Sequence, residues 1–349
     1  VHHWSRRLAR PTSRVAPVTY DLITVGRVNM DLFAKDIGAE FADITGFDAA
    51  VGGSPTNIAM GTARLGLRTA AFTAVGEDTV GEFVLRYLRD AGVVTDFVKC
   101  KPGKRISLAL VGVQPPNRFP LTFYRDDPAD IHLTIDDAST LPLDETRAVL
   151  LSGNAFSRGT CADAARRIAE MAAVVDCTVF MDLDLRPTDW SHPRAFGVGL
   201  RSVLPDVDVL IGTEEEFYAL LAPEPGDAAT GAGLDDQQRK ELDGIVGSLV
   251  AGGDTATLVL KRGARGSEII TADDRIMVTG FPVEAVNTVG AGDSFASGLI
   301  TSRLRGEDWY RACRIGNACG ALTVTRHGCA VAFPSREELD RFIADNGGL

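Results

Sequence analysis

Several patterns that define common protein classes are absent from this sequence. Its 349 residues contain no apolar run of the roughly 18 residues that a membrane-spanning helix needs. The six cysteines form no CxxC pair, and the five histidines show neither HExxH nor zinc-finger spacing. The GxxxxGK[ST] loop of P-loop proteins is also missing. These absences argue against a membrane protein, a zinc protein and a P-loop nucleotide hydrolase.

The charge balance narrows the choice of partners. The formal net charge is -11 at pH 7, which argues against nucleic acid as a partner. An anionic substrate would therefore need a locally basic pocket. The cysteines lie mostly in apolar surroundings, as expected of reduced thiols in the cytoplasm.

The N-terminal segment differs from the rest of the chain. Val1–Thr19 contains four arginines, no acidic residue and no apolar region of the kind that a secretory signal requires. We expect residues 1–19 to be a disordered leader, or to result from an upstream start site. A targeting role is the alternative interpretation.

Apolar strand-like runs alternate with helix-like segments from Tyr20 onwards. This alternation predicts an α/β protein with a doubly wound, mostly parallel sheet flanked by helices, and a single domain over 20–349. One helix is predicted to start at Ser54-Pro55. The strand candidates are Asp21–Val25, Ala70–Val75, Val149–Ser152, Thr178–Asp182, Val207–Ile211 and Thr257–Lys261.

Two stretches break this alternation. Residues 27–51 and 105–125 show extended patterning with no helix between their strands. In the second stretch, "RISLALVGV" and "RFPLTFYR" read as a hairpin joined by "QPPN". Both stretches predict a small β-sheet outside the main sheet, which we interpret as a lid. An exposed small sheet has edges that invite pairing, so a homodimer through the lid is expected.

A glycine-rich turn precedes a helix-like run near the C-terminus. Residues Gly290 to Phe295 read GAGDSF, and Phe295 stands where a dinucleotide-binding fingerprint needs its third glycine. A glycine turn entering a helix still forms an anion site. Asp293 would repel a resident phosphate, but a carboxylate is useful when a phosphoryl group is transferred to a hydroxyl that must lose its proton. The alternative is that Asp293 merely caps the helix.

Two motifs identify a family resemblance. "NTVGAGDSF" at 287–295 and "GGSPTNIAMG" at 52–61 resemble, in the same order, the two signatures of the ribokinase-like (PfkB-type) carbohydrate kinases. The similarity runs from about Tyr20 to Phe342. It implies a ribokinase-like fold and transfer of phosphate from ATP, with Mg²⁺, to a sugar hydroxyl.

The resemblance also implies roles for individual residues. Asp293 matches the catalytic base, and the turn that stabilises the transferring phosphoryl matches Gly290, Ala291 and Gly292. The positions that hold sugar hydroxyls match Asp31, Gly53 and Asn57. The loop near the nucleotide phosphates matches Gly263 and Gly266, Asn317 lies in the helix that borders the adenine site, and Glu216 matches an acid that orients magnesium through water. Apart from the resemblance, Lys261 ends a predicted strand and is expected to lie near phosphate.

Two positions depart from the family pattern. Asn287 stands where the signature usually has Asp, which puts a monovalent-cation site near that turn in doubt. Thr213 stands where the magnesium motif has Asn, which puts in doubt how strictly magnesium is held.

The substrate expectation depends on arginines. The segments "FYRDDPADIHL" and "MDLDLRPTDW" resemble the branch of the family that phosphorylates 5-dehydro-2-deoxy-D-gluconate in myo-inositol breakdown. The carboxylate of such a sugar acid suits an arginine fork, so Arg125 and Arg186 are the candidates. Each has a structural alternative, a salt bridge to Asp126 or Asp127, or to Asp182 or Asp184. The alternative substrates are 2-keto-3-deoxygluconate and fructose, and an inactive, sugar-sensing kinase fold is the rival from another class.

Overall fold

The computed structural model describes residues 17–114, 118–222, 233–252 and 257–349. The expected leader at 1–19 lies outside the described residues, apart from 17–19. The chain divides into two compact units. Unit 1 comprises Val1–Gly26 and Thr134–Thr279, and unit 2 comprises Arg27–Leu133 and Gly280–Leu349.

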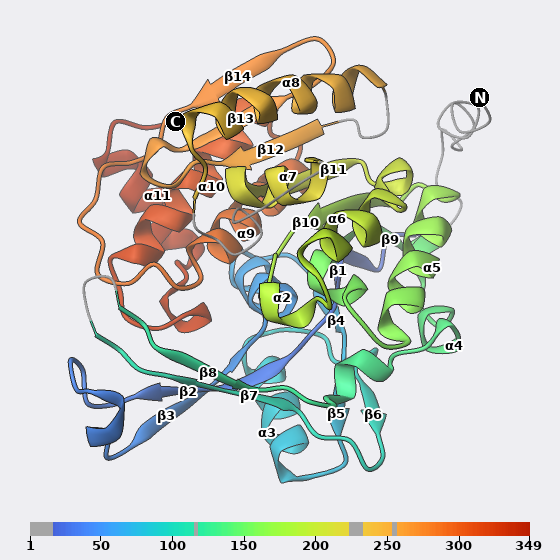
Figure 1. Ribbon diagram of the computed structural model, residues 1–349, viewed down its shortest axis with the longest axis vertical. Helices are drawn as coiled ribbons and strands as arrows, with labels where there is room; N and C mark the ends of the chain where they lie inside the picture. The colour runs from blue at the N-terminus through green and yellow to red at the C-terminus, as the bar shows by residue number, and fades with distance from the viewer. Residues whose placement is uncertain (1–16, 115–117, 223–232, 253–256) are drawn as a thin grey trace. The chain divides into compact units, whose positions relative to one another are not determined.

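Unit 1 is built on a mostly parallel sheet with the order β14-β13-β12-β11-β10-β9-β1 (Figure 1). The strands from β1 to β12 in this order run parallel, and β13 and β14 are antiparallel additions. The parallel strands are almost continuously buried, as expected when both faces of a sheet are covered. Their bounds are β1 (Tyr20–Val25), β9 (Thr146–Ser152), β10 (Thr178–Asp182), β11 (Val209–Thr213), β12 (Thr257–Lys261), β13 (Ser267–Ile270) and β14 (Arg275–Val278).

Helices flank this sheet. Helix α5 packs on β9 and β10, and α7 packs on β11 and β12. The α-helices of unit 1 are α4 (Ile135–Ala138), α5 (Cys161–Ala173), α6 (Pro193–Arg201), α7 (Glu214–Leu221) and α8 (Asp236–Gly252). Short 3-10 turns are η3 (Leu143–Glu145), η4 (Gly153–Phe156), η5 (Pro187–Asp189), η6 (Leu204–Asp206) and η8 (Gly263–Arg265). The predicted α/β class is confirmed.

Unit 2 contains the small sheet predicted from the two extended stretches. Its order is β3-β2-β7-β8, with β2 antiparallel to β3 and parallel to β7, and β7 antiparallel to β8. The predicted hairpin is therefore confirmed as β7 and β8, while the role of the sheet as a lid stays a prediction. Its strands are β2 (Asn29–Ala34), β3 (Phe47–Gly52), β7 (Ser107–Val111) and β8 (Leu121–Tyr124), with η1 at Phe41–Asp43.

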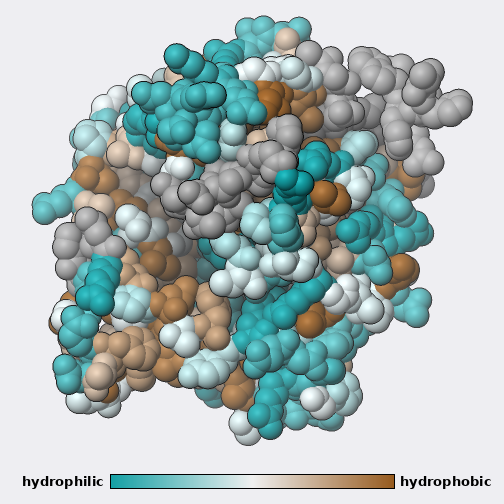
Figure 2. All heavy atoms as spheres, in the orientation of Figure 1, coloured by the Kyte–Doolittle hydropathy of each residue, from teal (hydrophilic) through white to brown (hydrophobic). Residues whose placement is uncertain are grey.

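The two-residue period of β2 places its polar side chains on one face of the small sheet. Asn29 and Asp31 share one face of the small sheet, whereas Met30 and Leu32 share the other. The register continues this second face through Leu108 and Tyr124, and Tyr124 is exposed. Figure 2 shows apolar side chains gathered at the surface over the small sheet.

The remaining elements of unit 2 include four long helices. They are α2 (Ser54–Arg64), α3 (Thr79–Asp90), α9 (Ala291–Leu304) and α10 (Trp309–Val324), followed by α11 (Arg336–Asp345) and accompanied by η2 (Ala129–His132) and η9 (Ala330–Ala332). The predicted strand at 70–75 is two strands, β4 (Thr69–Phe72) and β5 (Ala74–Gly76), and β5 pairs with β6 (Lys99–Lys101). In the described parts of the chain, no helix is long and apolar enough to cross a membrane.

Helices α2 and α9 approach each other closely because a glycine lies at their contact. A Cβ added to Gly61 would lie 2.3 Å from the Ser297 hydroxyl oxygen, so a larger residue cannot replace it without moving α9. Asn57 and Asp293 each lie one helical turn before these contact residues. The close packing thereby brings an amide of α2 within reach of a carboxylate of α9.

Candidate active site

The carboxylate of Asp293 is held by two side chains of α2. Its Oδ1 accepts a hydrogen bond of 2.8 Å from the Ser54 hydroxyl, and its Oδ2 accepts one of 2.8 Å from Asn57 Nδ2. The N-cap of α9 is Gly290, so Asp293 lies inside the first turn of the helix. Its position and partners differ from those of the helix cap considered as the alternative. Hydrogen bonds to a carboxylate favour its ionised form, which is the form that accepts a proton.

The turn that enters α9 requires glycine. Gly290 has φ +82°, and a Cβ there would lie 2.7 Å from Cys329 Sγ. Ala291 and Gly292 follow it in the first turn, where helix amides have no partner within the helix. Asn287 braces the approach, donating to the Gly328 carbonyl at 3.0 Å and accepting from the Val289 amide at 2.9 Å. The expectation that Asn287, in place of the usual Asp, disfavours a monovalent-cation site at this turn stays a prediction.

Asp31 lies in the same unit as Asp293, close enough for the charge of Asp293 to affect its pKa. Burial raises its pKa to about 6, the hydrogen bond from Asn29 and the charge of Arg27 oppose that shift, and the charge of Asp293 adds to it. A Cβ at Gly52 would lie 1.9 Å from Asp31 Oδ2. Gly53 has φ +103°, and a Cβ there would lie 2.6 Å from the Arg27 carbonyl oxygen. Both glycines therefore let the backbone approach the polar group that Asp31 anchors.

Two buried amide oxygens beside these carboxylates are able to accept hydrogen bonds from a ligand. Asn29 Oδ1 and Asn57 Oδ1 are buried and accept no hydrogen bond from the residues that the structure describes. Buried acceptors are nearly always satisfied, so these atoms point to a ligand that brings donors. Together with Asp31 they form a set of acceptors suited to several hydroxyl groups.

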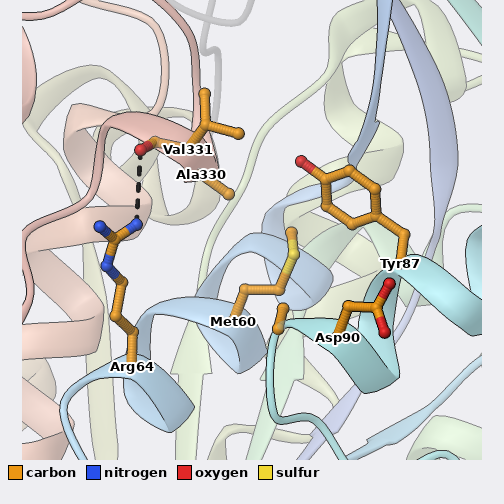
Figure 3. A pocket seen from close by; sticks show the side chains of 7 residues that line it. Met60, Arg64, Tyr87, Asp90, Ala330 and Val331 are labelled. Carbon is orange, nitrogen blue, oxygen red and sulfur yellow. Dashed lines mark hydrogen bonds between the residues drawn. The ribbon is translucent and has the colours of Figure 1, made fainter.

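A separate pocket of about 490 Å³ opens on unit 2 beside this group. It is lined by Met60, Arg64, Tyr87, Asp90, Ala91, Ala330 and Val331, and none of the predicted site residues is among them. Figure 3 shows Arg64 and Tyr87 on opposite sides of Met60, with Arg64 donating to the Val331 carbonyl at 3.4 Å. Burial raises the pKa of Tyr87, and the charge of Asp31 adds to that shift.

In unit 1, Lys261 ends β12 beside two carboxylates. Its Nζ lies 3.2 Å from both oxygens of Asp182, which ends β10, and 4.0 Å from Glu216 Oε2. The carboxyl ends of parallel strands meet at one edge of a sheet, where ligands of α/β proteins bind. Gly263 and Gly266 follow in the turn to β13, both with positive φ. This places a cation and a glycine turn together, as expected of the nucleotide side.

Glu216 is used by the fold as well. It forms a capping box with Thr213 at the start of α7, with Oε2 accepting from the Thr213 amide at 2.8 Å and Oε1 accepting from the Leu185 amide at 3.0 Å. Among the described residues, no group of three or more His, Cys, Asp or Glu side chains could hold a metal ion. The predicted contact of Glu216 with magnesium through water stays a prediction.

The two candidate arginines have different surroundings. Arg125 is buried in unit 2 and donates to both oxygens of Asp130, at 2.9 and 2.6 Å, and to Ser107 at 2.6 Å. Asp130 is thus a partner of Arg125 that the sequence analysis did not consider. Arg186 in unit 1 pairs with Asp184 at 2.9 Å and keeps 44% of its side chain exposed. Asp184 has φ +38°, which is strained for a residue other than glycine.

Most of the predicted site residues fall into two groups. Asp293, Asn57 and Asp31 with their glycines gather in unit 2, and Lys261 and Glu216 meet in unit 1. Asn317 is buried in α10, and its predicted role at the adenine remains untested. The sequence analysis did not single out Ser54 as a site residue, and it missed Asn29, Asp182 and Cys329. The strand alternation that places Asp31 could also have indicated Asn29.

The doubly wound fold and the buried carboxylate at a glycine turn agree with the sugar phosphotransferase that the sequence motifs imply. The chain belongs to the pfkB family of carbohydrate kinases, whose sequence profile matches residues 20–336.

Curated relatives agree with this assignment, and a solved structure shares the fold. The chain is 31% identical over 328 residues to the 5-dehydro-2-deoxygluconokinase of Listeria monocytogenes serotype 4b (strain CLIP80459), covering 93% of this chain and 96% of the relative. It is 32% identical over 329 residues to the enzyme of the same name from Bacillus anthracis (strain CDC 684 / NRRL 3495), covering 93% and 95%. The fold is similar to that of a putative ribokinase II from E. coli in complex with ATP and Mg²⁺, with a TM-score of 0.79, 22% identity, and coverage of 94% of this chain and 100% of that one.

The burial of Asp31 generates a stability prediction. Its folded pKa is raised from 3.8 to about 6, so ionisation opposes folding, and this penalty grows as the pH rises from about 4 to 6. Asp31→Asn removes the charge and should raise the free energy of unfolding by about 1–3 kcal/mol at pH 7.5, while lowering kinase activity. Urea unfolding at pH 4.5 and 7.5 measures the gain, which should be smaller at pH 4.5.

Asp36→Asn is the matched control for this measurement. Hydrogen bonds from Thr45 lower the pKa of the exposed Asp36 carboxyl, so its neutralisation should give no gain. An Asp31→Asn protein that is no more stable than the parent at pH 7.5 would contradict the assignment of a desolvated, functional carboxylate.

Proposed function

We propose that this kinase transfers the γ-phosphoryl group of ATP to the terminal hydroxyl of 5-dehydro-2-deoxy-D-gluconate, as a step of myo-inositol breakdown. The observation that carries the chemistry is the Asp293 carboxylate, which accepts hydrogen bonds from Ser54 and Asn57 beside buried, unsatisfied hydroxyl acceptors. The names of the relatives supply the particular substrate.

The proposed reaction is an in-line displacement. The sugar hydroxyl gives its proton to Asp293 as its oxygen bonds to the γ-phosphorus, and the bond from that phosphorus to the leaving ADP oxygen breaks. The amides of the Gly290–Gly292 turn stabilise charge on the transferring group. Magnesium that arrives with ATP neutralises phosphate charge, and Glu216 would orient it through water.

On the acceptor side, Asp31, Asn29 and Asn57 are proposed to receive hydrogen bonds from the sugar hydroxyls. On the nucleotide side, Lys261 and the turn with Gly263 and Gly266 are proposed to lie near the phosphates, and Asn317 near the adenine. A sugar-sensing protein without activity needs no held base, so the arrangement at Asp293 favours catalysis over that rival.

Arg186 is the stronger candidate for reading the substrate carboxylate. Its guanidinium is partly exposed beside Asp184, whereas Arg125 is buried and donates to both oxygens of Asp130. We therefore propose that Arg186 distinguishes the sugar acid from neutral sugars such as fructose. The role of Arg125 in the substrate site is proposed only as a second possibility, because its fork is already used.

Arg186→Met should separate these sugars. Leaving the carboxylate unpaired should weaken transition-state binding of 5-dehydro-2-deoxy-D-gluconate by about 2–5 kcal/mol and lower its kcat/KM accordingly. The effect on kcat/KM for fructose should be far smaller. A coupled assay of ADP release with both sugars, and with 2-keto-3-deoxygluconate, measures this and identifies the preferred substrate. Equal losses on acid and neutral sugars would rule out a carboxylate-reading role.

Arg125→Met is the comparison variant. It leaves Asp130 buried and unpaired, so a loss of about 3–5 kcal/mol in folding stability is expected. Arg125→Met combined with Asp130→Asn removes that unpaired charge. A double variant that folds well and still discriminates the sugar acid would assign Arg125 to the fold alone.

Asp293→Asn tests the proposed base. Asparagine keeps the size of the side chain and an oxygen for Ser54, but it cannot take a proton. We expect kcat to fall by roughly 10²–10⁴-fold, with melting temperature and ATP binding retained. Asp308→Asn is the control, because Asp308 caps α10 through the Arg311 amide at 2.8 Å and asparagine caps as well. An Asp293→Asn protein with nearly parental turnover would overturn the mechanism.

We also propose a homodimer formed through the apolar face of the small sheet. Met30, Leu32 and Leu108 of this face are only partly buried, and Tyr124 is 60% exposed. Tyr124→Glu should convert the dimer to a monomer in sedimentation equilibrium at micromolar concentration. Val198→Glu, at an equally exposed position on α6, is the control that should leave the mass unchanged. A parent protein that sediments as a monomer would contradict this proposal.

A further inference from the structure

Cys329 contacts two parts of the proposed catalytic group. It immediately precedes η9, and its side chain is buried. Its Sγ accepts a hydrogen bond of 3.2 Å from Asn57 Nδ2. A Cβ added to Gly290 would lie 2.7 Å from the same sulfur. The sulfur therefore packs directly against the turn that enters α9.

The amide of Asn57 uses both of its hydrogens in this arrangement. One N–H is directed at Asp293 Oδ2 at 2.8 Å, and the other is directed at Cys329 Sγ at 3.2 Å. An amide group has two donors on nitrogen and acceptor capacity only on oxygen. With both donors engaged, Asn57 Oδ1 points away from the carboxylate, and it accepts no hydrogen bond from the described residues.

The direction of this amide matters for the chemistry. If the amide turned over, Asn57 Oδ1 would face the Asp293 carboxylate, and two acceptors would repel each other at hydrogen-bond distance. Asp293 would lose one of its two donors, and the sugar would meet an N–H group in place of the oxygen. By accepting from Asn57 Nδ2, Cys329 Sγ holds the amide in the orientation that keeps the donor to Asp293 in place and presents Asn57 Oδ1 as an acceptor.

We infer that Cys329 is a positioning residue of the kinase, which acts through Asn57 to hold Asp293 and to present Asn57 Oδ1 to the sugar. The thiol takes no part in the transfer itself and undergoes no redox step. This inference rests on the proposed function, because it requires Asp293 to be the base.

The test compares Cys329→Ala with Cys329→Ser, using ATP and the sugar that gives the fastest ADP release. Alanine removes the acceptor and leaves a buried donor of Asn57 unpaired, so kcat should fall about 5- to 50-fold with the KM for ATP unchanged. Serine supplies an oxygen acceptor and should restore kcat to within about 3-fold of the parent. Should the alanine protein not fold, Cys329→Val, which fills the volume without an acceptor, replaces it.

A double variant shows whether Cys329 acts through Asn57. In an Asn57→Ala background there is no amide to position, so adding Cys329→Ala should change kcat by less than about 2-fold. Cys313→Ala, at another buried cysteine of unit 2, is the control for loss of a buried thiol and should keep parental kcat.

Three results would overturn the inference: parental kcat in Cys329→Ala, equal losses in the alanine and serine proteins, or multiplying losses in the double variant. These are distinguishable from failure of the proposed function. If Asp293→Asn is inactive while Cys329→Ala is parental, only the positioning role is wrong. If Asp293→Asn turns over normally, the base itself is wrong.

Discussion

The chemistry proposed for this kinase depends on the contact between α2 and α9. Gly61 lets Ser297 approach, and one turn earlier the same two helices present Asn57 and Asp293 to each other. Ser54 adds a second donor from the first residue of α2. A carboxylate on one helix is thus fixed by two donors on another, and its geometry follows from helix packing more than from loop conformation. Packing between rigid elements is what holds a reactive group within the small tolerance that catalysis needs.

The buried hydrogen-bond acceptors around Asp31 lower the stability of the fold, and favourable interactions elsewhere in the protein must offset this loss. Asp31 is desolvated, Asn29 and Asn57 keep buried oxygens unsatisfied, and Gly53 holds a left-handed backbone. A ligand with several hydroxyl donors would satisfy these atoms without moving them. Such preorganised polarity is characteristic of binding sites, because an apolar group at the same positions would be more stable in the absence of ligand.

The sequence predicted the α/β class, the small sheet and the hairpin within it, because strand period and apolar runs are local properties. It also predicted Asp293 and Asn57, which lie in distinctive motifs. It could not show that Ser54, predicted as a helix start, donates to Asp293, since that contact joins residues far apart in the chain. The same limit hid Cys329, whose partner Asn57 lies on α2, and Asp130 as the partner of Arg125. Long-range side-chain pairs depend on tertiary packing, which no local pattern encodes.

The overall negative charge led to the expectation of a locally basic pocket for anionic ligands. The three cations considered for ligand binding each lie beside a carboxylate: Lys261 beside Asp182, Arg186 beside Asp184, and Arg125 beside Asp130. A carboxylate beside each cation fixes its position before any ligand arrives, so less side-chain freedom is lost on binding. The same carboxylate weakens the attraction for anions in general, because its negative charge offsets the positive charge of the cation. Binding must then rely on directed hydrogen bonds from arginine forks and helix amides, and directed bonds distinguish a particular carboxylate or phosphate from the many other anions present.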